Sequence, residues 1–249
     1  MSLKVKNLTG GYGHLPILKN VNFDVKRGEL VGLIGLNGAG KSTTIKEIMG
    51  LLTPQKGEIY VDGLALKDNP ENYRKKIGFI PETPVLYEEL TLREHIEVTA
   101  LAYDIEQDIA NKRADSLLKL FRLEKKLDWF PTNFSKGMKQ KVMVLCAFLV
   151  KPSLFIIDEP FVGLDPLAIH DLLEMMKQAK ENGAALLMST HILATAERYC
   201  DKFIILHDGK VRAFGSIEKL RTSFKMPNAT LDDIYIALTV EKDAEVNDS

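Results

Sequence analysis

An eight-residue stretch, Gly35-Leu36-Asn37-Gly38-Ala39-Gly40-Lys41-Ser42, constrains the fold of this chain more than any other feature. It fits the pattern G-x-x-x-x-G-K-[S/T], in which glycines let backbone N–H groups curl around phosphate oxygens. A continuous apolar run, Leu30 to Ile34, precedes it, and apolar residues at helical spacing follow it. Because this pattern requires a buried strand before the loop and a helix after it, we predict a phosphate-binding loop rather than a chance glycine turn.

The predicted phosphate loop gives its residues separate roles. Lys41 is expected to reach the β- and γ-phosphates of a nucleotide, and the Ser42 hydroxyl to bind Mg²⁺. The helix that follows should point its positive N-terminus at the same phosphates. The residues expected to contact the nucleotide here are Gly35, Leu36, Asn37, Gly38, Ala39, Gly40, Lys41, Ser42 and Thr43.

The rest of the chain alternates between strand and helix patterns. Apolar runs at 154–157, 184–188 and 203–206 predict buried strands. A helix should open at Asp165-Pro166, an N-cap followed by proline, and end near Asn182-Gly183. Such alternation predicts an α/β fold, with a parallel sheet covered by helices on both faces.

Two regions depart from this alternation. The first thirty residues follow a period of two and predict strands, and the segment 57–63 predicts a short exposed strand. Residues from about 85 to 150 are mostly helical in pattern, with a capping box at Thr91 and Glu94. We therefore expect a helical insert within the α/β core.

A pair of adjacent carboxylates narrows the function. The apolar run from Leu154 ends in Asp158-Glu159-Pro160, and the carboxyl ends of strands are where ligands bind in open α/β sheets. Asp158 is placed to hold Mg²⁺ through water, and Glu159 to polarise an attacking water as general base. The alternative is an Asp-Glu pair that caps a strand end, and it would have to coexist with the phosphate loop by accident.

Composition excludes several other classes. A formal net charge of −1 gives no general attraction to nucleic acid, so no nucleic-acid partner is expected. The two cysteines, Cys146 and Cys200, are far apart, and Cys146 lies in an apolar run. We therefore expect neither a disulfide bond nor a zinc site, and we expect the protein to be in the reducing cytoplasm. The longest apolar run is about half of the ~20 residues that a membrane span needs.

These motifs, in this order, resemble the ATPases of ABC transporters, and the resemblance covers the chain to about Leu238. The segment Phe134-Ser135-Lys136-Gly137-Met138 takes the place of the family signature L-S-G-G-Q. The resemblance implies that Ser135 and Gly137 contact the γ-phosphate bound to an opposite subunit, although Ser135 is also a good helix N-cap. The F-S-K-G-M-K-Q run resembles the ABC-2-like exporter branch, and the segments Ile80–Pro84 and Ala229–Tyr235 resemble the ATPase of bacterial Ecs-type transporters.

The resemblance implies roles for four further residues. His191 resembles the family's switch histidine, which bonds the γ-phosphate and positions the water. Asp165 matches a loop that touches the partner's site, and it can act as a helix cap as well. Tyr12 is placed against the adenine ring, with core packing or a simple turn as the rival reading. Glu82 stands where the family usually has glutamine, either as a Mg²⁺ ligand or as a residue that faces a partner.

The resemblance also predicts the architecture in more detail. It implies a P-loop NTPase of the RecA-like class with an N-terminal antiparallel β-subdomain and an inserted helical subdomain. We expect one ABC ATPase domain over 1–240. The core and β-subdomain should occupy about 1–84 and 151–240, and the helical subdomain about 85–150. The polar tail, 241–249, is predicted to be disordered.

The function predicted from the resemblance is Mg²⁺-dependent ATP hydrolysis that drives a transporter. Two copies of the chain should pair head to tail around ATP, and a separate integral membrane subunit should receive the stroke. The apolar segment 84–87 either borders the groove for that subunit or closes the core of the helical insert. The protein would then be cytoplasmic, at the inner face of the cell membrane. The alternatives are a soluble ABC-type ATPase that acts on ribosomes or DNA, and a regulatory ATP-binding module with little turnover.

Overall fold

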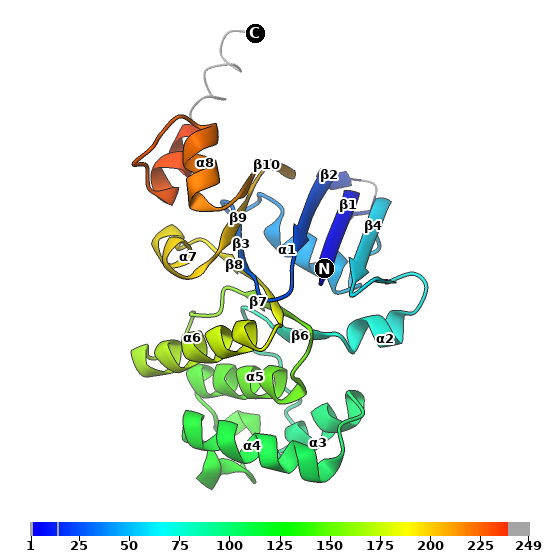
Figure 1. The fold of residues 1–249 in the computed structure, drawn as a ribbon. Coiled ribbons are helices and arrows are strands. Elements are labelled where there is room, and N and C mark those ends of the chain that lie inside the picture. Colours follow the sequence, from blue (N-terminus) through cyan, green and yellow to red (C-terminus); the bar gives the residue numbers. More distant parts are fainter. Residues whose placement is uncertain (1, 14, 239–249) are drawn as a thin grey trace.

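The computed structural model describes residues 2–13 and 15–238, which form two β-sheets and the helices around them (Figure 1). The smaller sheet is antiparallel, in the order β2-β1-β4-β5. It consists of β1 (Leu3–Tyr12), β2 (Leu15–Val25), β4 (Lys56–Val61) and β5 (Leu64–Ala65). Buried residues occupy every second position from Val21 to Val25 of β2, which accounts for the period of two there, whereas register shifts interrupt the alternation in β1.

The larger sheet has the order β10-β9-β3-β8-β7-β6, and every pairing except that of β10 with β9 is parallel. Its strands are β3 (Leu30–Ile34), β6 (Ile77–Ile80), β7 (Leu154–Asp158), β8 (Ala185–Thr190), β9 (Lys202–His207) and β10 (Lys210–Gly215). All residues of β3 and β8 are buried, because helices or the smaller sheet cover both faces. The apolar runs in the sequence therefore predicted these strands correctly.

Helices cover the larger sheet as expected of an α/β protein. Helix α1 (Lys41–Ile48) places Ile45 and Ile48 in the core shared by both sheets. On the other face lie α3 (Leu92–Ala102), α4 (Gln107–Phe121), α5 (Lys136–Val150) and α6 (Pro166–Glu181). The shorter helices are α2 (Pro70–Arg74), α7 (Leu193–Tyr199) and α8 (Ile217–Ser223), with short 3₁₀ turns at Glu124–Lys126 and Pro131–Asn133.

Two helices begin directly after the capping residues that the sequence predicted. Thr91 and Glu94 form the predicted capping box at the start of α3, and Asp165 caps α6 ahead of Pro166. Helices α3 to α5 all fall within the range expected for the helical insert, and they occupy one end of the molecule (Figure 1). The division into subdomains with the stated boundaries nevertheless stays a prediction.

The prediction that the segment 57–63 forms an exposed strand was wrong. The segment predicted at 57–63 is β4, which pairs with β1 inside the smaller sheet and buries Ile59 and Val61. Glycines at both ends suggested a short exposed strand, whereas its partner β1 lies some fifty residues earlier in the chain. The predicted disorder of 241–249 lies outside the described residues. No helix in the described part of the chain is long and apolar enough to cross a membrane.

Candidate functional site

The phosphate-loop segment forms a tight curve between β3 and α1. Gly38 and Gly40 have φ angles of +84° and +109°, which side chains other than glycine rarely adopt. A Cβ atom on Gly35 would lie 2.5 Å from the carbonyl oxygen of Leu206, so the backbone approach itself requires glycine there. Lys41 is only 7% exposed, and its Nζ donates to the Gly35 carbonyl oxygen at 2.7 Å. The ammonium group therefore lies along the curve of the loop.

Several backbone amides of this loop face no protein acceptor. The N–H groups of Leu36 and Ala39 are used within the protein, but those of Asn37, Gly38 and Gly40 have no hydrogen bond to another described residue. The first turn of α1 adds its own unbonded amides, as every helix start does. Unbonded amides and a helix N-terminus in one curve form a cradle for an anion.

The two carboxylates predicted from the sequence lie at the carboxyl end of β7. Asp158 lies opposite Ser189 of β8, whose hydroxyl donates to the Asp158 carboxylate. Burial raises the pKa of Asp158, and the charges of Glu82 and Glu159 act in the same direction, whereas Ser189 and Lys41 oppose the rise. Five polar groups from different parts of the chain therefore meet at this edge of the sheet.

Glu159 and His191 form a hydrogen-bonded pair. His191 Nδ1 lies 2.9 Å from Glu159 Oε2, and the carboxylate is only 11% exposed. Glu159 has a φ of +45°, unusual for a residue with a side chain, and its N–H donates to the Ser189 backbone and hydroxyl oxygens. The backbone thus holds Glu159 in one orientation, and the imidazole holds the carboxylate.

The acidic residues at this edge suit a magnesium ion whose ligands come partly from the protein and partly from nucleotide phosphates. Burial is the main cause of the raised pKa of Asp158, and the charges of Glu82 and Glu159 add to it. No cluster of three His, Cys, Asp or Glu side chains able to hold a metal alone occurs among the described residues. Mg²⁺ is typically held by one or two carboxylates together with nucleotide phosphates, so the donors present, Ser42, Asp158 and Glu82, fit it.

The residues expected to act across a dimer form a second cluster at the start of α5. Ser135 caps this helix by accepting from Met138 N–H, so the cap role is real. A Cβ on Gly137 would lie 2.6 Å from the Gly163 carbonyl oxygen, which brings α5 against the loop before α6. Asp165, at the end of that loop, forms an ion pair with Lys141 at 2.8 Å.

This second cluster and the phosphate loop are separate within one chain. No hydrogen bond or ion pair among the described residues joins Ser135, Gly137 or Asp165 to the residues 35–43. Tyr12, at the end of β1, is nearer to the loop, since its hydroxyl accepts from Lys46 on α1 at 3.0 Å. Tyr12 is 48% exposed, so the core-packing alternative for this residue is excluded.

Sequence reasoning missed three residues that organise these clusters. Ser189 has no role in the sequence analysis, although its register opposite Asp158 gives it a partner. Lys141 and Gln140 lie on α5; Lys141 pairs with Asp165, and Gln140 donates to the Pro81 carbonyl just before Glu82. The strand alternation could have suggested Ser189, whereas the two α5 contacts depend on packing between distant segments.

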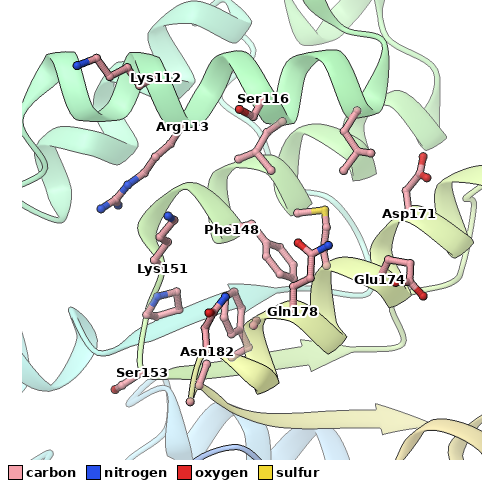
Figure 2. Close-up of a pocket in the computed structure, with 18 of the residues that line it drawn as sticks. Lys112, Arg113, Ser116, Phe148, Lys151, Ser153, Asp171, Glu174, Gln178 and Asn182 are labelled. Atoms are coloured by element: carbon pink, nitrogen blue, oxygen red, sulfur yellow. The ribbon is translucent and has the colours of Figure 1, made fainter.

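A groove of about 1040 Å³ lies away from both clusters, between α4, α5 and α6 (Figure 2). Figure 2 shows Phe148 between Arg113 and Lys151 on one side and Asp171 and Glu174 on the other. Ser153 and Ala184, which precede β7 and β8, also line it, so it opens at the amino ends of these strands. None of the predicted site residues lines this groove.

The fold and the site together define a P-loop nucleotide-binding protein, with a parallel sheet, a phosphate loop after β3 and an Asp-Glu pair after β7. Comparison with known proteins identifies the family. The family model described as "ABC transporter" matches residues 18–162, and this chain belongs to the ABC transporter ATP-binding family.

Curated relatives support the assignment along nearly the whole chain. The chain is 62% identical to the ABC-type transporter ATP-binding protein EcsA of Bacillus subtilis, over 96% of this chain and 97% of the relative. It is 42% identical to an ABC transporter ATP-binding protein, YthP, of the same organism, over 88% of each chain. The linearmycin resistance ATP-binding protein LnrL is 36% identical over 86% of this chain and 69% of the relative.

Solved structures agree on the fold. A structure described as the ATP-binding subunit of an ABC transporter superposes with a TM-score of 0.94 at 57% identity, covering 96% of this chain and all of that one. A dimeric ATP-binding cassette, MJ0796, bound to ADP and phosphate gives a TM-score of 0.77 at 30% identity, over 86% of this chain and 98% of that one. The predicted fold class and the predicted family are both confirmed.

Proposed function

We propose that this protein is an ATP-hydrolysing motor subunit of a bacterial ABC transporter. The observation that carries the proposal is the meeting of Lys41, Asp158 and the Glu159–His191 pair at one edge of the sheet. A phosphate cradle alone would suit a binding module. A fixed, histidine-paired carboxylate beside it supplies the group that hydrolysis requires.

The residues divide the reaction between them. The free amides of the loop and the Lys41 ammonium bind and orient the triphosphate. Glu159 accepts a proton from the attacking water, and His191 keeps the carboxylate turned towards it. Mg²⁺ would neutralise charge on the phosphates when it is bound, with Ser42, Asp158 and Glu82 as the residues that hold it. Tyr12 presents an exposed ring on which the adenine can stack.

The second cluster implies a second copy of the chain. Ser135, Gly137 and Asp165 have no role at their own phosphate loop, but a head-to-tail dimer would bring them to the partner's nucleotide. The solved structure of MJ0796 is described as dimeric and bound to ADP and phosphate, which supports this arrangement as a proposal for this chain. ATP would then close the pair and hydrolysis would reopen it.

An exposed apolar surface fits a membrane subunit as the receiver of this motion. Val85 and Tyr87 are 75% and 65% exposed, whereas Leu86 between them packs on the core. Leu86 therefore supports the core-closing alternative for the segment 84–87, and the exposed Val85 and Tyr87 support the partner-facing alternative. Tyr87 N–H donates to His95 of α3, and Val98 and Leu101, three and six residues further along this helix, are exposed as well. Apolar side chains gathered in this way mark a contact surface for a partner.

The direction of transport is also part of the proposal. Relatives described as a linearmycin resistance protein and a Nod factor export protein are 36% identical to this chain, which favours the exporter branch. A membrane partner would hold this subunit at the cytoplasmic face. An ATPase acting on ribosomes or DNA, and a module with little turnover, are the competing functions.

Replacing the proposed general base tests the ATPase directly. Glu159→Gln should keep ATP affinity but release phosphate about 10²–10⁴-fold more slowly, the usual contribution of a general base. Glu174→Gln, which changes a carboxylate in the groove of Figure 2, serves as the control and should match the parent. Equal phosphate release by Glu159→Gln and the parent would remove Glu159 from this role, and a parent without turnover would favour the regulatory module.

A further inference from the structure

The C-terminal part of the chain holds the phosphate loop at both ends of its turn. Gly209, in the turn between β9 and β10, donates its N–H to the Ala39 carbonyl oxygen at 3.1 Å. Ala39 N–H donates to the Leu36 carbonyl oxygen at 3.1 Å and closes the turn. Leu36 N–H in turn donates to the hydroxyl oxygen of Tyr235 at 2.9 Å. Asn37 and Gly38, whose amides have no acceptor among the described residues, lie between these anchored residues.

Packing fixes Tyr235 in this position. Residues 231–238 are helical, and Tyr235 is 7% exposed. Its neighbours in this core include Ile34, the last residue of β3, and Ile205 of β9. The helix therefore packs against the strand from which the phosphate loop emerges.

The same C-terminal helix also contacts the segment that carries His191. Leu231 N–H donates to Glu197 of α7 at 2.8 Å, and Glu197 pairs with Arg221 of α8 at 3.2 Å. Helix α7 begins at Leu193, two residues after His191. One helix near the end of the chain thus connects the phosphate loop with the helix that follows the switch histidine.

We infer that Tyr235 is a positioning residue for the phosphate loop, through which the C-terminal helix sets the affinity for nucleotide. The inference rests on the proposed nucleotide binding. Amides held in the bound geometry before the ligand arrives lose less freedom on binding, so a fixed turn raises affinity. Without the hydroxyl, Leu36 N–H loses its acceptor and the turn loses one of its two anchors.

Tyr235→Phe isolates this effect because it removes one hydroxyl and keeps the ring in the core. ATP affinity is measured by calorimetry with full-length protein in a Glu159→Gln background, which suppresses turnover. One lost hydrogen bond should raise the dissociation constant about threefold to tenfold. Tyr103→Phe is the matched control, because the Tyr103 hydroxyl likewise makes one hydrogen bond to the backbone, in this case by donating to the Ile77 carbonyl oxygen at 2.7 Å. Its dissociation constant should equal the parent's.

Hydrogen exchange of the peptide 35–38 without nucleotide supplies a second readout. Exchange should be faster in Tyr235→Phe than in the parent and unchanged in Tyr103→Phe. Parent-like affinity in Tyr235→Phe would overturn the inference while leaving the proposed function intact, as would equal weakening in both variants. A parent that binds no ATP would overturn the proposed function and this inference together.

Discussion

At the scale of single residues, the site combines common nucleotide-binding chemistry with one unusual charge. Glu82 follows Pro81, whose carbonyl oxygen is held by Gln140, so the position of the segment is set by α5. Burial is the main cause of the raised pKa of Asp158, and the negative charge of Glu82 adds to it. Like charges repel, and a shared divalent cation would relieve the repulsion. Glu82 therefore favours a magnesium-loaded site.

We expect Glu82→Gln to hydrolyse ATP but to need more Mg²⁺ than the parent. The neutral amide is a weaker ligand for a hard cation than a carboxylate, so the Mg²⁺ concentration for half-maximal rate should rise a few-fold, equivalent to roughly 1 kcal/mol or less. The measurement is a Mg²⁺ titration of phosphate release at fixed ATP. Superimposable titrations would leave Glu82 as a residue that faces the partner instead.

At the scale of elements, one buried carboxylate lies between α1 and the smaller sheet. Glu47 is fully buried on α1, and neither of its carboxylate oxygens has a hydrogen-bond partner in the described part of the chain. A Cβ on Gly10 of β1 would lie 1.9 Å from one of these oxygens, so only glycine leaves room for the carboxylate. Burial raises the pKa of Glu47 from 4.5 to about 7. At pH values between 4.5 and about 7, the folded protein thus holds a proton on Glu47 that the unfolded chain has released.

This proton makes stability depend on pH in a defined direction. Below pH 4.5 Glu47 is protonated in both states and contributes nothing, whereas between pH 4.5 and 7 the folded state binds more protons. The free energy of unfolding therefore falls across that window, by roughly 3 kcal/mol in all, and then levels off. Glu47→Gln should abolish this term, so its stability relative to the parent should rise by about 2 kcal/mol between pH 5 and pH 8.

Denaturant unfolding at several pH values measures that difference. Glu89→Gln, a change at an exposed carboxylate, is the control and should keep the parent's slope. A constant offset between Glu47→Gln and the parent over the whole range would show that Glu47 is ionised in the fold.

The elements also show what the sequence can and cannot predict. The phosphate loop, the Asp-Glu pair and the caps at Thr91 and Asp165 depend on neighbours within a few residues, so the sequence predicts them well. The partner of β4 lies fifty residues away, and the packing of Tyr235 on Leu36 spans two hundred. Such contacts depend on how whole elements pack, and no local pattern records them.

At the scale of the whole molecule, the proposed function needs the two clusters to act together. In that proposal the phosphate loop, Asp158 and Glu159 bind and cleave the nucleotide, whereas Ser135, Gly137 and Asp165 lie in a separate cluster of the same chain. We therefore propose that a second chain supplies the missing cluster, and that the dimer forms only when ATP joins the two clusters. In this proposal the useful result of ATP hydrolysis is a movement of the two subunits relative to each other.

The most direct test is the mass of the particle in solution with and without ATP. Glu159→Gln, which traps ATP, should have the monomer mass without nucleotide and twice that mass with ATP and Mg²⁺, measured by light scattering on a sizing column. Adding Ser135→Arg should preserve ATP binding but keep the protein monomeric, because the bulky side chain would meet the opposite phosphates. A monomer under every condition, or a dimer that forms equally well with Ser135→Arg, would contradict the account.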